Sequence, residues 1–289
     1  MRQLQSADAS ALHSPFLLWR RGLYAKIAAA ISVLCIVFYA AQHPAGPPNG
    51  GTTLGYVLGT LAAFLLLWLA WFGIRRRRYG GTRSLVGLLS AHVYLGLALV
   101  VVATLHAGFR FHYNVHTLTF VLLVLVVASG LFGTVAFWRL PEEMTRNRGG
   151  ATLTSMAAEL AAMDVQCRQL ALAFPDDIVS LVVEVTSPRP TVGIIARLLS
   201  PRTSRLIAQR HLEVIAHIES LLVQGRETSP AEVLPLVQGL TQRLVLLRRM
   251  QRDRRYRALM LQWRAMHVPL TVALIVALAV HVIVVFFDR

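Results

Sequence analysis

Cysteine is scarce in this chain, and its scarcity excludes several classes of protein. The 289 residues include two cysteines, Cys35 in an apolar run and Cys167 far along the chain in a polar region. Two isolated cysteines exclude a disulfide framework, a Cys-x-x-Cys-His attachment site for c-type haem and a four-cysteine iron–sulfur site. Any haem that the chain binds must therefore be held non-covalently.

Acidic residues and lysine are also scarce. The chain has 14 aspartates and glutamates against 29 lysines and arginines, giving a formal net charge of +15, and Lys26 is its only lysine. A basic balance of this size can indicate nucleic-acid binding. Most of these arginines flank apolar runs, however, so we expect cytoplasmic loop charge in a membrane protein and no nucleic-acid partner.

The sequence also lacks the common motifs of nucleotide-binding proteins and hydrolases. It contains no Gly-x-Gly-x-x-Gly, no P-loop, no His-Glu-x-x-His and no Gly-x-Ser-x-Gly. We therefore expect no catalytic residue and no nucleotide site within the chain.

Long apolar runs are abundant instead. Hydrophobic residues make up 55 % of the chain and the mean hydropathy is +0.56, which is too apolar for a soluble protein. Five runs have roughly the 20 residues that a hydrocarbon layer of about 30 Å requires: 23–41, 54–74, 85–108, 115–138 and 265–287. The first could be mistaken for a signal peptide, but Phe38 and Tyr39 occupy the position that a cleavage site needs for a small residue. The sequence predicts an all-α fold with five transmembrane helices, the first a retained anchor.

The arginines predict the orientation of these helices. Basic clusters precede the first run, follow the second and fourth, and precede the fifth, whereas the opposite interhelical loops hold only Arg110. By the positive-inside rule the N-terminus is cytoplasmic and the C-terminus periplasmic, in a bacterial-type inner (plasma) membrane. We divide the chain into a cytoplasmic segment (1–23), transmembrane helices 1 to 4 (24–138), a cytoplasmic helical insert (139–264) and transmembrane helix 5 (265–289).

The insert has the pattern of a small all-α domain. Stretches 153–173 and 203–223 carry apolar residues at helical spacing between arginine, glutamate and glutamine. Five prolines are expected to divide it into short helices, the last of which starts near Ala231 and leads into the fifth run: Pro175, Pro188, Pro190, Pro201 and Pro230. The basic stretch 248–257 would be solvated and attracted to anionic lipid, with partner docking as the alternative.

Two of the apolar runs each carry two histidines fourteen positions apart, His92 with His106 and His267 with His281. Fourteen helical steps bring a side chain back to within about 40° of its starting direction, about 21 Å further along the axis. Ionisable side chains are costly in lipid and are candidates for function. Because the third and fifth runs are predicted to be parallel, His92 would lie level with His267 near the cytoplasmic side, and His106 level with His281 near the outer side.

Two imidazoles at each level match the two axial ligands of a b-type haem. Zinc and copper also bind imidazole, but the third and fifth runs contain no carboxylate or thiolate that would complete their ligand shell. The alternative to metal binding is a structural role, in which the histidines hydrogen-bond between helices. We predict two haem b groups, with His92 and His267 on the inner iron and His106 and His281 on the outer iron.

A few further residues could assist haem binding. Arg110 on the outer side and Arg83 or Arg264 on the inner side could pair with haem propionates. Glycines allow a flat cofactor or, equally, a neighbouring helix to approach closely; they are Gly55, Gly59, Gly87, Gly96, Gly130 and Gly133.

The other histidines are expected to be solvated. For His112 and His116, at the outer mouth between the third and fourth runs, propionate or proton binding is the alternative. The remainder are expected at the surface: His13, His43, His211 and His217.

At this point the chain resembles the di-haem transmembrane cytochromes b, through His92-x13-His106 on one run and His267-x13-His281 on a later one. The respiratory quinol-oxidising cytochrome b carries such histidines on the second and fourth helices of its bundle, and the ferric reductase and NADPH oxidase domains carry them on the third and fifth spans, as here. The resemblance implies a four-helix haem bundle from the second to the fifth run, with the first run peripheral. The insert, the missing flavin and nicotinamide domain and the missing Pro-Glu-Trp-Tyr motif depart from the pattern, so reductase activity and quinone binding stay open.

We therefore expect an electron-transfer subunit of a larger, hetero-oligomeric redox complex, without a substrate site of its own. Its partners would be membrane lipid and a periplasmic or membrane redox protein, such as a c-type cytochrome or an iron–sulfur subunit, with quinone as a further candidate. The alternatives are a quinone-reactive subunit of an oxidoreductase, a haem-free transporter or scaffold, and a redox sensor that signals through the insert.

Overall fold

The chain is helical throughout the part that the structure describes. This computed structural model describes residues 16–42, 50–75, 82–187, 201–223 and 230–287, and within these ranges it contains helices and short connections but no strand. The chain forms two compact units: unit 1 is Met1–Arg139 with Met260–Arg289, and unit 2 is Leu140–Leu259. The prediction of an all-α fold is confirmed.

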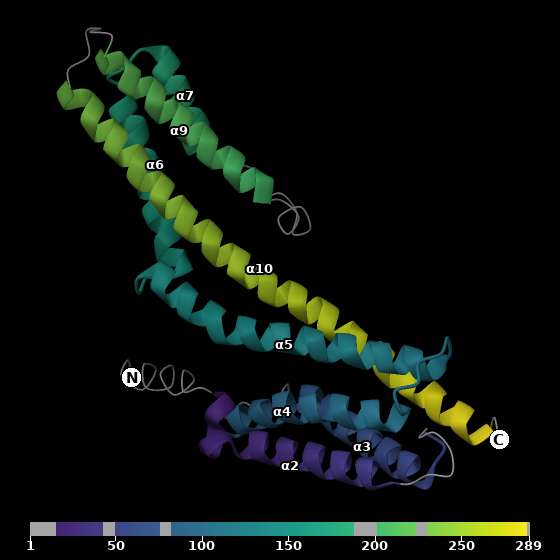
Figure 1. Cartoon of the computed structure of the whole chain (residues 1–289). Helices are drawn as coiled ribbons and strands as arrows, with labels where there is room; N and C mark the ends of the chain where they lie inside the picture. The colour runs from purple at the N-terminus through teal and green to yellow at the C-terminus, as the bar shows by residue number, and fades with distance from the viewer. Residues whose placement is uncertain (1–15, 43–49, 76–81, 188–200, 224–229, 288–289) are drawn as a thin grey trace. The chain divides into compact units, whose positions relative to one another are not determined.

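Among the described residues, five helices are long and apolar enough to cross a membrane. They are α2 (Trp19–Ala41), α3 (Thr53–Arg75), α4 (Thr82–Ala107), α5 (Val115–Arg148) and α10 (Pro230–Phe287), as Figure 1 shows. Their outer faces carry exposed apolar side chains such as Leu34, Phe64 and Phe132. Such faces need lipid rather than water around them, and the chain is accordingly a multi-pass membrane protein.

The first membrane helix begins where its apolar run begins. The backbone of Arg20, Arg21 and Gly22 has φ values of 46°, 57° and 73°, in the left-handed region. A right-handed helix cannot continue through three such residues. The regular part of α2 therefore starts near Leu23, as predicted.

The fourth membrane helix extends beyond its apolar run, which ends at Trp138. α5 continues through Pro141 to Arg148. The Thr145 hydroxyl donates to the Pro141 carbonyl at 2.9 Å, and Arg146 pairs with Glu142 one turn earlier at 2.5 Å. Contacts between residues four apart stabilise a solvated helix, so the end of the apolar run does not end the helix. The last helix, α10, likewise runs unbroken over 58 residues.

The core of unit 1 draws on all five membrane helices. Small and aliphatic side chains fill it and let the helices approach closely. Its fully packed members are Ala28 of α2, Leu65, Leu66 and Leu69 of α3, Ala91, Leu95, Ala98 and Leu99 of α4, Leu123 of α5 and Leu274 of α10. The helices that carry the candidate site, α4, α5 and α10, all contribute buried side chains to this core.

Unit 2 is built from the end of α5, α6 (Leu153–Ala171), α7 (Asp176–Thr186), α9 (Pro201–Val223) and the first part of α10. Its prolines start helices: Pro175 is the N-cap of α7, and Pro201 and Pro230 are the first residues of α9 and α10. Proline suits this position because its missing N–H would have no partner there. Pro188 and Pro190 lie outside the described residues.

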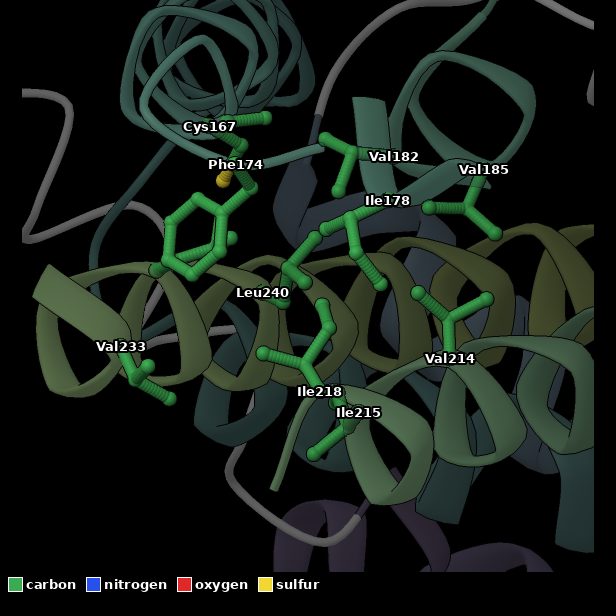
Figure 2. Packing of buried hydrophobic residues seen from close by; sticks show 12 residues of the cluster. Cys167, Phe174, Ile178, Val182, Val185, Val214, Ile215, Ile218, Val233 and Leu240 are labelled. Atoms are coloured by element: carbon green, nitrogen blue, oxygen red, sulfur yellow. The ribbon is translucent and has the colours of Figure 1, made fainter. Parts of the chain in front are cut away.

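The core of unit 2 joins α7, α9 and α10. Figure 2 shows Ile178 and Val182 of α7 pointing toward Ile218 of α9 and Leu240 of α10. Cys167 of α6 lies at the edge of the same cluster and is 1 % exposed. Burial raises the pKa of the Cys167 thiol, so it remains protonated and unreactive at neutral pH.

One histidine contradicts its sequence prediction. His211, expected at the surface, is 3 % exposed. Its Nδ1–H donates to the Ile207 carbonyl at 2.7 Å, and its Nε2 accepts from Arg243, which also donates to Asp164. The prediction was wrong because a buried histidine is tolerated where both ring nitrogens have partners. His217 is exposed as expected, and His13 and His43 lie outside the described residues.

Two leucines of α10 test the core of unit 2. Leu236 is fully buried and Leu234 is 55 % exposed, although both lie in the same helical turn. Leu236→Ala should lower the opening free energy of unit 2 by about 2–5 kcal/mol. Hydrogen–deuterium exchange of the full chain in detergent measures this as faster exchange in peptides from 140–259. Leu234→Ala should change it by no more than about 0.5 kcal/mol, and equal effects of the two variants would contradict this core.

Candidate functional site

The structure brings both predicted histidine pairs together within unit 1. His92 of α4 and His267 of α10 line the same cavity. His106 and His281, fourteen residues further along each helix, have ring centres 6.0 Å apart. Because the earlier histidines share one cavity and the rings of the later ones lie close together, these parts of α4 and α10 run parallel.

The first pair lines an apolar cavity of about 360 Å³. Cavities that bind small molecules and cofactors have about 300–1,000 Å³ and a few polar groups on apolar walls. Besides the two histidines, only Thr134 and Thr271 bring polar side chains to this wall; the other lining residues are Leu66, Leu69, Ala70, Val93, Gly96, Leu99, Leu123, Val126, Val127, Gly130, Leu131, Val268, Val272, Leu274 and Ile275. A Cβ at Gly96 would meet nothing within 4 Å, so a side chain there would project into open space.

A serine on α5 fixes the ring of His267. Ser129 Oγ lies 2.8 Å from the Val126 carbonyl, to which it donates, and 2.7 Å from His267 Nδ1. The hydroxyl has a single hydrogen, so while it donates to the Val126 carbonyl it accepts from His267, and Nδ1 then carries the proton. Nε2 of His267 is then the nitrogen with a free lone pair, the state in which imidazole binds a metal.

Trp263 lies one turn before His267 and supports the same ring. The two rings are stacked with centres 5.5 Å apart, and the indole N–H donates to the Ser129 carbonyl at 2.7 Å. Gly133 makes this possible, because a Cβ at that position would lie 2.1 Å from the indole. The rings of Trp263 and His267 thus pack against a stretch of α5 that contains small residues.

The α3 backbone fixes the ring of His106. The Gly55 carbonyl lies 2.8 Å from His106 Nδ1. A carbonyl only accepts, so Nδ1 carries the proton and Nε2 has the lone pair. Gly59, one turn further along α3, lets the ring lie against the helix, since a Cβ there would be 2.7 Å from the imidazole.

A third histidine joins the second pair. His116, in the first turn of α5, places its Nδ1 2.7 Å from Nδ1 of His281, and the two ring centres are 4.5 Å apart. Sequence analysis placed His116 among the solvated loop histidines. It is exposed, but it also contacts a predicted iron ligand.

The spacing of the second pair fits two ligands of one metal. An imidazole nitrogen binds a first-row metal at about 2.0 Å, and the ring centre lies about 1.1 Å behind it, so two axial rings on one iron have centres about 6 Å apart. The observed distance between His106 and His281 is 6.0 Å. Within the described ranges, no group of three or more His, Cys, Asp and Glu side chains could hold a metal ion. Two imidazoles alone do not complete the four-ligand shell of a zinc ion.

The predicted propionate partners lie at the two ends of α4 and within α10. Arg110 is exposed in the connection between α4 and α5, and Arg264 is exposed on α10 three residues before His267. Arg83 lies in the first turn of α4, and its side chain is outside the described part.

Sequence analysis missed three side chains of this site and one contact: Ser129, Trp263, Phe72, whose ring centre lies 5.0 Å from that of His92, and the contact of His116 with His281. Trp263 had a signal, because residues four apart share a helix face. His116 also had a signal. It lies at the start of the fourth run and His281 lies near the end of the fifth, and because these two runs are predicted to be antiparallel, both histidines are expected on the outer side. Ser129 and Phe72 had none beyond their presence in apolar runs.

Comparisons with known proteins found no match: no protein-family model, no curated protein and no solved structure is similar to this chain.

Ser129 provides a test of the His267 geometry. Ser129→Ala removes the acceptor of the Nδ1–H, so the His267 ring should lose its preference for the Nδ1-protonated form. Long-range 15N–1H spectra of histidine-labelled protein in detergent report this tautomer. Thr104→Val is the control, because the Thr104 hydroxyl donates to the Val100 carbonyl of its own helix. A His267 signal that stays unchanged in Ser129→Ala would contradict the hydrogen bond.

Proposed function

We propose that this chain is a di-haem b-type cytochrome that transfers electrons across a membrane as a subunit of a larger redox complex. His92 and His267 would hold the inner haem, and His106 and His281 the outer one. The observation that carries the proposal is the apolar cavity whose wall contains both His92 and His267. Two imidazoles at one apolar cavity within membrane helices provide the ligands and the low-dielectric surroundings of a b-type haem.

The hydrogen bonds behind the ligands support the same function. A metal-bound histidine usually donates its other ring N–H to a carbonyl, carboxylate or hydroxyl, which fixes the tautomer and strengthens the ligand. His106 has the Gly55 carbonyl in this role and His267 has Ser129. If the histidines served only to hydrogen-bond between helices, nothing would require one histidine of each level to present Nε2 as its lone-pair nitrogen.

Bound haem would supply one-electron Fe(II)/Fe(III) chemistry, and the chain would supply its position and surroundings. The four histidines set two depths along α4 and α10. The apolar side chains of α3, α5 and α10 exclude water from the first level. Arg110 would pair with propionates at the outer level, and Arg83 or Arg264 at the inner level.

The arginine distribution supports a topology for this electron path. With the N-terminus and unit 2 in the cytoplasm and the C-terminus in the periplasm of a bacterial inner membrane, the His92 level lies near the cytoplasm. Electrons would pass between a periplasmic or membrane redox protein, such as a c-type cytochrome or an iron–sulfur subunit, and a partner or quinone at the inner face.

Haem content tests the proposal directly. The purified full chain should contain two haem b by the pyridine haemochrome assay. His92→Ala and His267→Ala should each leave one haem with the same absorption spectrum, because either substitution removes an axial ligand of the same iron. His106→Ala and His281→Ala should give a second, different one-haem spectrum.

His217→Gln is the matched control, since His217 is exposed in unit 2, and it should retain two haems. A chain that is purified intact without a Soret band would overturn the proposal and favour a haem-free transporter or scaffold. Retention of two haems in His92→Ala would overturn the assignment of the inner ligands.

A further inference from the structure

We infer that His116 is a positioning residue for the outer haem: its Nδ1 accepts the Nδ1–H of His281 and so leaves Nε2 of His281 free to bind iron. This inference rests on the proposed function. It assigns a role to a third histidine at the outer level, where the spacing of the sequence motif provides only two.

The contact between the two rings allows two proton arrangements. The Nδ1 atoms are 2.7 Å apart, and a hydrogen bond at that distance needs one N–H and one lone pair. If His281 donates, its Nε2 carries the lone pair and His116 is protonated at Nε2. If His116 donates, its own Nε2 is the free one and His281 cannot bind iron. The contact therefore decides which of the two histidines can be the ligand.

The position of His106 selects the first arrangement. The ring centre of His281 lies 6.0 Å from that of His106, which is the spacing of two axial ligands on one iron. His116 makes its ring contact and its short nitrogen–nitrogen contact with His281, and it comes from α5 rather than from the parallel pair α4 and α10. His281 is thus the ligand and His116 the acceptor behind it, in the position that Ser129 has behind His267.

Local structure holds His116 in this place. The Asn114 side chain accepts from the Thr117 backbone N–H at 3.0 Å, which caps the start of α5. One turn further, the Thr119 hydroxyl lies 2.8 Å from the Val115 carbonyl and 3.3 Å from the Ala277 carbonyl of α10. Ala277 is itself one turn before His281, so α5 and α10 are in register where the histidines meet.

Three variants of His116 separate positioning from packing. Asparagine places its side-chain oxygen as many bonds from Cα as Nδ1 of histidine, so His116→Asn keeps the acceptor. His116→Leu keeps a side chain of similar size without it. Loss of the acceptor weakens the His281–iron bond, and outer-shell partners of this kind change metal affinity by about 10- to 100-fold.

In His116→Leu, transfer of the outer haem to a haem acceptor protein should be about 10-fold faster or more. The reduction potential of the outer haem should rise, because a ligand without its acceptor stabilises Fe(III) less. The inner haem should keep its potential and its EPR signal. His116→Asn should resemble the wild type in all three measurements, and so should His217→Gln.

Each other result overturns the inference. If His116→Leu retains the outer haem with unchanged potential, His116 is not the acceptor. If His116→Asn loses the outer haem as His116→Leu does, while His281→Ala retains two haems, His116 is itself the axial ligand.

A wild-type chain without haem would overturn the proposed function separately. The 15N tautomer of His281 decides the hydrogen bond in that case: it should be protonated at Nδ1 in the wild type and lose this preference in His116→Leu. A His281 protonated at Nε2 in the wild type would overturn the inference.

Discussion

The parallel course of α4 and the C-terminal part of α10, which brings their histidines to the same levels, is the constraint on which the rest of unit 1 depends. Two helices with the same spacing between their histidines bring both pairs together only if they run in the same direction and in register. His92 and His267 then share one cavity, and His106 and His281 lie with ring centres 6.0 Å apart. A shift of one helix along the other would place four imidazoles at four separate depths in lipid, where each is costly.

Small residues of the membrane helices make room for ring side chains of neighbouring helices. Gly59 and Gly133 are the sites where α3 and α5 receive the rings of His106 and Trp263, because a Cβ would clash with either ring. Gly55 contributes its backbone carbonyl to His106. The sequence left a flat cofactor or a neighbouring helix as alternatives at these glycines, and at Gly59 and Gly133 the structure places a ring side chain of a neighbouring helix.

Unit 2 is stabilised in a different way. Its helices bury aliphatic side chains from α7, α9 and α10 in one cluster. Among its described residues, Arg243 pairs with Asp164 and His211, and Arg148 pairs with Asp253 at 2.6 Å. Such pairs are costly to break because one buried charge is left without its partner. Unit 2 thus buries aliphatic side chains among its own helices, while the outer faces of unit 1 remain apolar.

The sequence by itself determined the membrane helices and the spacing of their histidines. Hydrophobic length predicts a span because every backbone polar group in lipid must be satisfied within a helix, and fourteen residues return a side chain to nearly the same helix face. Only the tertiary structure decided what lies behind each histidine: Ser129 behind His267, Gly55 behind His106 and His116 beside His281. These partners come from other helices, and so does the Arg243 that made His211 a buried residue. Helical period describes one helix at a time, whereas hydrogen bonds between helices depend on how the helices pack.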